Sequence, residues 1–121
     1  MFTFQSIVMI NKILFICSAN KQRSKTAEDY FSNKHHDIQF YSAGTNKKIC
    51  EREGTNSLNI ELLQHVDFIF VMENKHKKEV KNFINGKFKK EIIVLNILDI
   101  YKYFQKELIE ILEEKVTSYL E

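Results

Sequence analysis

Four short apolar runs alternate with amphipathic segments along the chain, and this alternation limits the possible folds more than any other feature of the sequence. Each run is rich in β-branched and aromatic residues and is apolar on both faces. The runs are Lys12–Ile16, Ile38–Ser42, Asp67–Met72 and Glu91–Ile97. Strands of this kind are typical of a parallel sheet that helices cover on both sides. We therefore predict four buried parallel strands.

The segments that separate and follow these runs have helical periodicity. The predicted helices are Ser24–Asn33, Ser57–His65, a segment that Asn74 caps and Asn85-Gly86 ends, and Lys106–Leu120. Strands that alternate with helices predict an α/β fold, here a three-layer, doubly wound, four-stranded parallel sheet with helices on both faces. In such a sheet, ligands bind at the carboxyl ends of the strands.

The length and charge of the chain suit one globular domain. We expect a single domain over residues 1–121, large enough to fold without a disulfide or metal. Residues 1–8 are expected to be a dispensable extension, because the first strand needs only Lys12–Ile16. With 18 Lys and Arg against 16 Asp and Glu, the formal net charge is +2, which predicts neither a nucleic-acid partner nor a membrane surface.

The two cysteines, Cys17 and Cys50, are too few for a disulfide scaffold, and no Cys/His cluster has the spacing of a zinc site. We therefore expect a cytoplasmic protein without a metal or cofactor. The pair His35-His36 is interpreted as solvated and Cys50 as structural.

The sharpest local feature follows the first strand. CSANKQRS, residues 17–24, leads directly into the first predicted helix. Such a loop directs backbone N–H groups and the positive end of the helix dipole at one point, which stabilises an oxyanion or a thiolate. Cys17 is then a candidate nucleophile, and Arg23 offers a planar fork that can hold two phosphoryl oxygens. Ser24 can donate its hydroxyl to the thiolate or cap the helix.

This loop and three further segments resemble the low-molecular-weight protein tyrosine phosphatases. KILFICSANKQRS followed by TAEDYF is similar to that family's opening strand, C-x5-R-S loop and first helix. YSAGT at 41–45 resembles its S-A-G-T segment, and VDFIFVME at 66–73 resembles its third strand. ILDIY at 97–101 stands where the family has its I-P-D-P-Y acid loop. The resemblance covers nearly the whole chain from Lys12 and points to the short bacterial members.

The resemblance implies a role for each matching residue. Cys17 is expected to be the nucleophile, Arg23 the phosphate clamp, and Asp99 the general acid and then the base. Ser42 is expected to support the loop. The residues expected to bind phosphate or substrate are Ser18, Ala19, Asn20, Lys21, Gln22, Ser24 and Tyr101, with Asn20 and Ser24 bracing the loop and Tyr101 forming a wall of an aromatic slot.

The sequence also departs from the family pattern. Ala19 replaces a glycine, Lys25 a proline after the loop serine, and Ile100 the proline after the acid. Alanine fits without strain only if its φ is negative. Gln22 stands where many members have a second cysteine, so the disulfide that shields the nucleophile cannot form. The family's supporting histidine has no counterpart in register, and His65, which lies near, is not assigned.

The expected function is that of a phosphomonoesterase that hydrolyses phosphotyrosine-like aryl phosphates through a phosphocysteine intermediate. The alternative, motivated by Ala19, Ile100 and the missing supporting histidine, is a phosphate-binding or regulatory module with weak or no turnover. Arsenate reduction is disfavoured, because related proteins use two further downstream cysteines for it. The expected partner is a tyrosine-phosphorylated protein or a small aryl phosphate, and the chain is expected to be a monomer. A basic patch could steer an acidic phosphoprotein; it consists of Lys75, Lys77, Lys78, Lys81, Lys87, Lys89 and Lys90.

Overall fold

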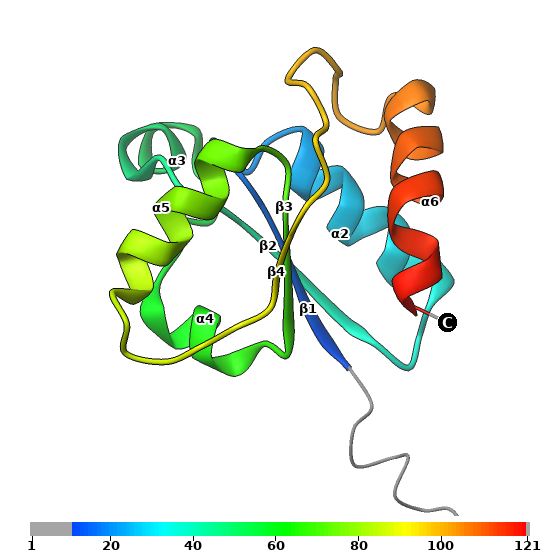
Figure 1. Ribbon diagram of the computed structural model, residues 1–121. Helices are drawn as coiled ribbons and strands as arrows, with labels where there is room; N and C mark the ends of the chain where they lie inside the picture. Colours follow the sequence, from blue (N-terminus) through cyan, green and yellow to red (C-terminus); the bar gives the residue numbers. More distant parts are fainter. Residues whose placement is uncertain (1–10, 121) are drawn as a thin grey trace, which may run out of the picture.

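The computed structural model describes residues 11–120, in which strands and helices alternate along the chain (Figure 1). The strands are β1 (Lys12–Cys17), β2 (Gln39–Gly44), β3 (Phe68–Val71) and β4 (Ile92–Val94). The helices are α2 (Arg23–Lys34), α3 (Lys47–Glu53), α4 (Ile60–His65), α5 (Asn74–Ile84) and α6 (Lys106–Leu120). The extension predicted at residues 1–8 lies outside the described residues.

The four strands form one parallel sheet in the order β2-β1-β3-β4. β1 lies inside this sheet, where Leu14 pairs with Tyr41 of β2 on one side and with Ile69 of β3 on the other. The strand order therefore reverses at β1, as predicted for a doubly wound sheet. In such sheets the ligand site lies at the carboxyl ends of the strands beside this reversal, which here is the end of β1 at Cys17.

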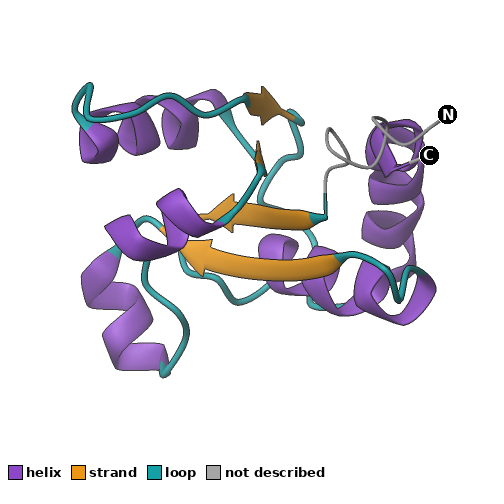
Figure 2. Ribbon diagram, turned by 90° about the horizontal axis from the view of Figure 1, so that it is seen from below, coloured by secondary structure: helices purple, strands orange, loops and turns teal. Residues whose placement is uncertain are grey.

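Helices cover both faces of the sheet, so the fold has three layers (Figures 1 and 2). Alternate residues of β1 enter two separate cores. One core, against α2 and α6, contains Ile13, Phe15, Phe31, Phe70, Leu108, Leu112 and Val116. The other, against α4 and α5, contains Leu14, Ile16, Leu63, Ile69, Val80 and Ile84. Every side chain of β1 from Ile13 to Cys17 is thus buried, which explains why this strand is apolar at successive positions.

Three predicted elements are shorter in the structure, and one of them, the strand predicted over Asp67–Met72, loses one residue at each end. The helix predicted over Ser57–His65 begins only at Ile60, because the Asn59 side chain caps it by accepting a hydrogen bond from a backbone N–H at 2.8 Å. The strand predicted over Glu91–Ile97 covers three residues. It is followed by Asn96, whose φ of 57° is left-handed and incompatible with a strand.

Two helix starts also differ from the prediction. Asn74 is the first residue of α5 and not its cap, a position that Glu73 occupies. Helix α3 was not predicted. It begins where the Asn46 side chain accepts a hydrogen bond from the backbone N–H of Ile49, and it ends at Gly54, whose φ of 73° suits glycine.

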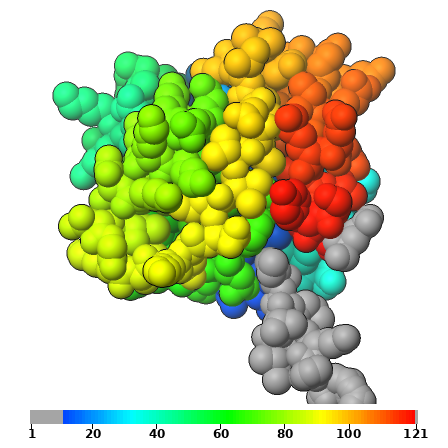
Figure 3. Space-filling view, in the orientation of Figure 1, coloured from blue at the N-terminus to red at the C-terminus, as the bar shows by residue number. Residues whose placement is uncertain are grey.

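The chain beyond β4 leads to the same end of the sheet as the loop after β1. In the space-filling view this segment crosses the surface between α5 and α6 and continues above the carboxyl ends of the strands (Figure 3). It carries Asp99, which the fold thereby brings close to a loop that lies more than 70 positions earlier in the chain.

Candidate active site

The loop between β1 and α2 forms the floor of a pocket of about 310 Å³. Its lining residues are Cys17, Ser18, Ala19, Lys21, Gln22, Arg23, Ile49, Arg52, Glu53 and Asp99. Seven of these were among the predicted site residues, and the other three come from α3, which was not predicted. The structure therefore gathers the candidate nucleophile, clamp and acid around one cavity at the carboxyl end of β1.

The Cys17 sulfur is in contact with a hydroxyl at the start of α2. Its Sγ lies 3.0 Å from Oγ of Ser24, and both residues are buried. Nδ2 of Asn20 donates a hydrogen bond to the same Oγ at 2.9 Å. Since an amide nitrogen can only donate, the serine oxygen accepts from Asn20, and its own proton is free to point at the sulfur. This arrangement stabilises negative charge on Cys17.

The loop is braced from behind by the segment that follows α3. Oδ1 of Asn20 accepts a hydrogen bond from the backbone N–H of Asn56 at 3.0 Å, and Oγ1 of Thr55 donates to the carbonyl of Ala19 at 2.6 Å. The Cys50 thiol is fully buried and lies 3.6 Å from the same carbonyl. Cys50 thus packs beneath the loop, as expected for a structural residue.

Alanine at position 19 causes no backbone strain. The left-handed residue of the loop is Asn20, with a φ of 55°, and Ala19 is not among the residues with positive φ. Asparagine tolerates this region better than most residues. The condition under which alanine can replace the family's glycine is therefore met.

Two predicted site residues, Ser42 and Tyr101, lie outside the pocket lining. The Ser42 hydroxyl donates to Oε1 of Glu28, and the Ser42 carbonyl accepts a hydrogen bond from Nδ2 of Asn56 at 3.4 Å. The backbone N–H of Asn56 in turn donates to Oδ1 of Asn20, so Ser42 is linked to the loop through Asn56. Tyr101 is half-buried and packs against the core beneath α6, and it is not one of the pocket-lining residues.

Arg23 is held rigidly although it is charged, with only 2% of its side chain exposed. Nη1 donates to Oε2 of Glu73 at 2.5 Å and to the carbonyl of Ile97 at 2.8 Å. The bond from Arg23 lowers the pKa of Glu73, which keeps this carboxylate ionised. Nε lies 3.7 Å from Oδ1 of Asp99. The guanidinium is thus fixed through one nitrogen, while another faces the pocket residue Asp99.

His76 is a residue of the site region that the sequence analysis missed. It is fully buried at the start of α5, and its Nε2 lies 2.9 Å from Oγ of Ser18. Its Nδ1 accepts a hydrogen bond from the backbone N–H of Glu73 at 3.0 Å. Burial and the nearby Arg23 lower the pKa of His76 to about 4. The sequence signal that could have revealed His76 is its position three residues after Glu73, just beyond a buried strand, where the two residues form a capping box.

The rim of the pocket is polar and partly ion-paired. Nζ of Lys21 lies 3.0 Å from the Glu53 carboxylate, and Nε of Arg52 lies 3.5 Å from the same group. The Lys21 bond lowers the pKa of Glu53, so this carboxylate stays charged at neutral pH. Ile49 and Ala19 supply the apolar part of the lining.

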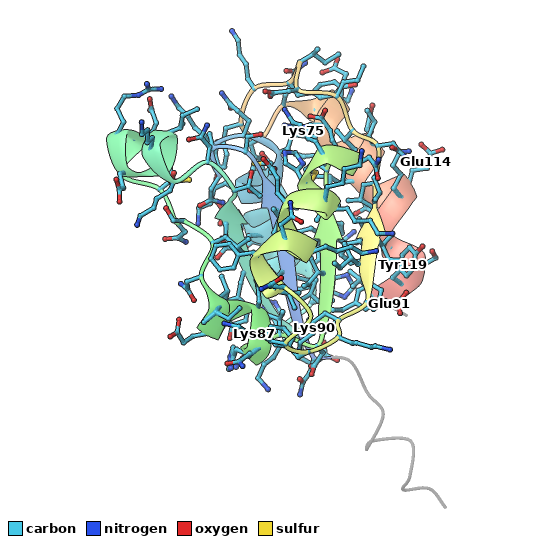
Figure 4. The ribbon with its side chains drawn as sticks, turned by 60° about the vertical axis from the view of Figure 1, so that its left-hand side comes forward. Lys75, Lys87, Lys90, Glu91, Glu114 and Tyr119 are labelled. Carbon is cyan, nitrogen blue, oxygen red and sulfur yellow. The ribbon has the colours of Figure 1, made fainter. Side chains whose placement is uncertain are left out.

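The basic patch spans the length of α5 and the segment that leads to β4. Lys75 lies toward the end of the sheet that carries the pocket, whereas Lys87 and Lys90 lie at the opposite end (Figure 4). Nζ of Lys90 donates to the carbonyls of Gln64 and Val66, so this lysine completes the C-terminus of α4.

The rest of the described chain holds no group of three or more His, Cys, Asp or Glu side chains placed to bind a metal ion. His35 is half-buried and packs against Phe31 and Phe40, while His36 is exposed. Within residues 11–120, none of the helices has the length and apolar character needed to cross a bilayer.

The fold is that of solved bacterial low-molecular-weight tyrosine phosphatases. No family model matches the sequence, and no curated protein matches it either. The tyrosine phosphatase AmsI of Erwinia amylovora is 20% identical and superposes with a TM-score of 0.73 over 93% of this chain and 92% of its own. Wzb of Vibrio vulnificus, solved with benzylphosphonate, is 19% identical with a TM-score of 0.71 over 92% and 97%.

YwlE, an arginine phosphatase, has the same fold. It is 20% identical, with a TM-score of 0.63 over 91% of this chain and 99% of its own. At these identities the likeness establishes the fold. The resemblance found in the sequence is confirmed to that extent, and the chemistry must be argued from the chain's own residues.

Proposed function

We propose that the chain is a phosphomonoesterase that hydrolyses phosphotyrosine-like aryl phosphates through a phosphocysteine intermediate. The observation that carries the proposal is the buried contact between Cys17 Sγ and Ser24 Oγ, in a loop that opens a helix and faces the guanidinium of Arg23. Loop amides, helix dipole and hydroxyl all favour a thiolate, and the fork of Arg23 suits two phosphoryl oxygens.

The first step transfers the phosphoryl group to sulfur. The Cys17 thiolate attacks phosphorus, an S–P bond forms, and the P–O bond to the aryl group breaks. The electron pair stays on the departing phenolate oxygen, which takes the proton of Asp99. Arg23 and the loop N–H groups hold the phosphoryl oxygens throughout.

The second step releases phosphate. A water oxygen attacks phosphorus while Asp99 takes a proton from it, and the S–P bond breaks. Sulfur leaves with its electron pair as the thiolate, which the hydroxyl of Ser24 stabilises. The products are inorganic phosphate and the starting form of the site, so no cofactor is needed.

The lining of the pocket and the activity of a related protein both support an aryl phosphate as the substrate. Ile49 and Ala19 offer apolar surface to a ring, and AmsI is a tyrosine phosphatase. The polar rim of Lys21 and Glu53 suits a peptide backbone or charged side chains around the ring. A phosphoarginine peptide is the natural comparison substrate, because YwlE is an arginine phosphatase.

The test is turnover of p-nitrophenyl phosphate by the purified chain, with Cys17→Ser and Cys50→Ala as matched variants. We expect the wild type and Cys50→Ala to release p-nitrophenol and Cys17→Ser to be inactive. Mass spectrometry of acid-quenched protein should find the phosphoryl group on the peptide that contains Cys17, and inorganic phosphate should protect this cysteine from iodoacetate.

Two outcomes would contradict the proposal. Turnover that survives Cys17→Ser would exclude the phosphocysteine mechanism. Tight phosphate binding by a wild-type chain that turns over no aryl phosphate or phosphoarginine would indicate the anion-binding module instead.

A further inference from the structure

Ser18 and His76 belong to the pocket region, but the phosphoryl-transfer steps do not use them. Ser18 lines the pocket directly after the nucleophile, and His76 lies behind it at the start of α5. The two residues are 58 positions apart in sequence, yet Oγ of Ser18 and Nε2 of His76 are separated by 2.9 Å. Their contact joins the end of β1 to the first turn of the helix that follows β3.

The hydrogen bonds around His76 determine which ring nitrogen carries the proton. The backbone N–H of Glu73 points at Nδ1 from 3.0 Å. A backbone N–H can only donate, so Nδ1 is the acceptor and has no proton. With its pKa lowered to about 4, the ring is neutral at pH 7, and its single proton is on Nε2.

The proton on Nε2 in turn determines how the Ser18 hydroxyl points. Nε2 donates to Oγ of Ser18, so this oxygen is the acceptor in the contact with His76. The proton of the Ser18 hydroxyl must therefore point away from the histidine. Ser18 forms part of the pocket wall. We propose that His76 fixes the Ser18 hydroxyl as a hydrogen-bond donor to the oxyanion that the pocket binds. The inference rests on the proposed function in one respect, namely that this oxyanion is a phosphoryl group.

A hydroxyl that is fixed as a donor binds an anion differently from a hydroxyl that rotates freely. A free hydroxyl can present either its proton or a lone pair, and an incoming anion must reorient it. A hydroxyl already turned toward the pocket needs no reorganisation, and hydrogen bonds to anions are about twice as strong as neutral ones. Ser18 is then an oxyanion-binding residue, and His76 is a positioning residue that acts through it.

Glu73 organises both parts of this arrangement. Its backbone N–H sets the tautomer of His76, and its carboxylate holds Nη1 of Arg23 at 2.5 Å. The first turn of α5 thus orients two donors of the pocket, the Ser18 hydroxyl and the guanidinium of Arg23, although the loop sequence gives no sign of this helix's part in it.

The test measures binding of inorganic phosphate to the full chain by isothermal titration calorimetry, which requires no turnover. The variants are Ser18→Ala, Ser18→Thr, His76→Asn and the double variant Ser18→Ala/His76→Asn. Asparagine places an acceptor where Nδ1 was, so Glu73 keeps its hydrogen bond, but it has no atom at the position of Nε2. The matched control is His65→Asn, the same change at an exposed histidine.

We expect Ser18→Ala to weaken phosphate binding about tenfold, the effect of one hydrogen bond to a charged group. His76→Asn should weaken it about threefold, because the freed hydroxyl still donates part of the time. Ser18→Thr keeps the hydroxyl and should recover most of the affinity that Ser18→Ala loses, and His65→Asn should bind like the wild type within about twofold. The double variant should match Ser18→Ala, since His76 acts only through Ser18.

A purely structural histidine would give a different pattern. His76→Asn would then weaken binding by the same factor in both backgrounds, and this additivity would overturn the inference. Equal affinities of Ser18→Ala and the wild type would overturn it as well, while leaving the proposed function intact. A wild-type chain that binds no phosphate would overturn both.

Discussion

Asp99 is held loosely for a residue with a proposed part in proton transfer, because 65% of its side chain is exposed and its nearest cation, Nε of Arg23, lies 3.7 Å away. The next residue, Ile100, is also exposed and lacks the rigidity of the family's proline. The dependence of turnover on the leaving group therefore tests whether this loop places the carboxyl group at the leaving oxygen.

Asp99→Asn should affect substrates in proportion to their need for a proton. The phenolate of tyrosine leaves poorly unless it is protonated, whereas p-nitrophenolate leaves readily without help. We expect kcat/KM to fall by roughly 10² to 10⁴ for a phosphotyrosine peptide and clearly less for p-nitrophenyl phosphate. Asp37→Asn, an exposed aspartate in the turn before β2, is the control and should change neither. A small and equal loss for both substrates would mean that Asp99 only shapes the loop.

Gly44 allows the closest approach between β2 and the phosphate loop. A Cβ at this position would lie 2.4 Å from the carbonyl oxygen of Ser18, 2.6 Å from Sγ of Cys50 and 3.0 Å from the carbonyl carbon of Ala19. Two of these three atoms belong to the backbone of the loop, so the loop itself would have to move.

Gly44→Ala should therefore lower the free energy of unfolding by about 1–3 kcal/mol and also weaken phosphate binding. Gly54→Ala is the matched control, because an added Cβ there meets no atom within 4 Å and the cost comes only from a φ of +73°. It should destabilise by about 1 kcal/mol without changing phosphate affinity. Denaturant titration and calorimetry measure the two effects. Unchanged phosphate binding in Gly44→Ala would show that the loop tolerates the displacement.

At the scale of elements, a side-chain cluster joins α6 to α2. The Glu113 carboxylate accepts hydrogen bonds from Nζ of Lys34 at 2.7 Å, from the Tyr30 hydroxyl, and from Oγ1 of Thr117 at 3.1 Å. These bonds, the one from Lys34 most, lower the pKa of Glu113 to about 2. A carboxylate with a lowered pKa in the folded state stabilises that state only while it is ionised.

The stabilisation by Glu113 should accordingly depend on pH. It is fully present above the ordinary glutamate pKa of about 4.3 and is lost as the pH falls from there toward 2. Glu113→Gln should lower the unfolding free energy by about 1 kcal/mol at pH 7, a modest value because the pair is partly solvated, and by almost nothing near pH 2. Glu114→Gln, an exposed neighbour on α6, is the control (Figure 4). An effect of Glu113→Gln that is independent of pH would contradict this account.

The elements that the sequence predicted well are those with strong local patterns. β1 and α6 match because one is apolar at successive positions and the other repeats apolar residues every three or four positions. Helix α3 was missed because its seven residues, KKICERE, contain only two apolar side chains, and its caps, Asn46 and Gly54, are the main signal. The end of β4 depends on the left-handed Asn96, which propensity alone does not reveal.

At the scale of the whole molecule, the residues of the site also differ in how easily the sequence reveals them. Cys17, Arg23 and Ser24 could be found in the sequence because they are close together in one loop. The contacts of Ser18 with His76 and of Asn20 with Asn56 join residues 58 and 36 positions apart, and only the fold brings them together. A resemblance specifies positions but not partners: it did not reveal that Ser42 reaches the loop through Asn56, or that Tyr101 packs against the core.

Charge is also distributed unevenly over the molecule. Residues 74–91 contain seven lysines and two glutamates, so this segment carries +5, and the formal net charge of +2 leaves −3 for the rest of the chain. Helix α5, at 11 residues about 16 Å long, holds four of these lysines, and the other three follow its C-terminus, so the patch extends from the pocket end of the sheet to its other end. That length exceeds the Debye length of about 10 Å at 0.1 M salt, so the two ends of the patch act on a ligand independently.

Charge reversal at the two ends of the patch should therefore affect substrate capture differently. Lys75→Glu/Lys78→Glu changes the first half of α5, where Lys75 lies toward the pocket, and Lys87→Glu/Lys89→Glu makes the same change of net charge beyond the end of α5, where Lys87 lies at the far end of the sheet (Figure 4). For an acidic phosphotyrosine peptide at about 0.1 M salt, we expect the near pair to lower kcat/KM about tenfold and the far pair less than about twofold. Both variants should approach the wild type as salt is raised toward 1 M, where the Debye length is about 3 Å. Equal losses from the two pairs would mean that net charge alone attracts the substrate, and that the position of the patch has no role in capture.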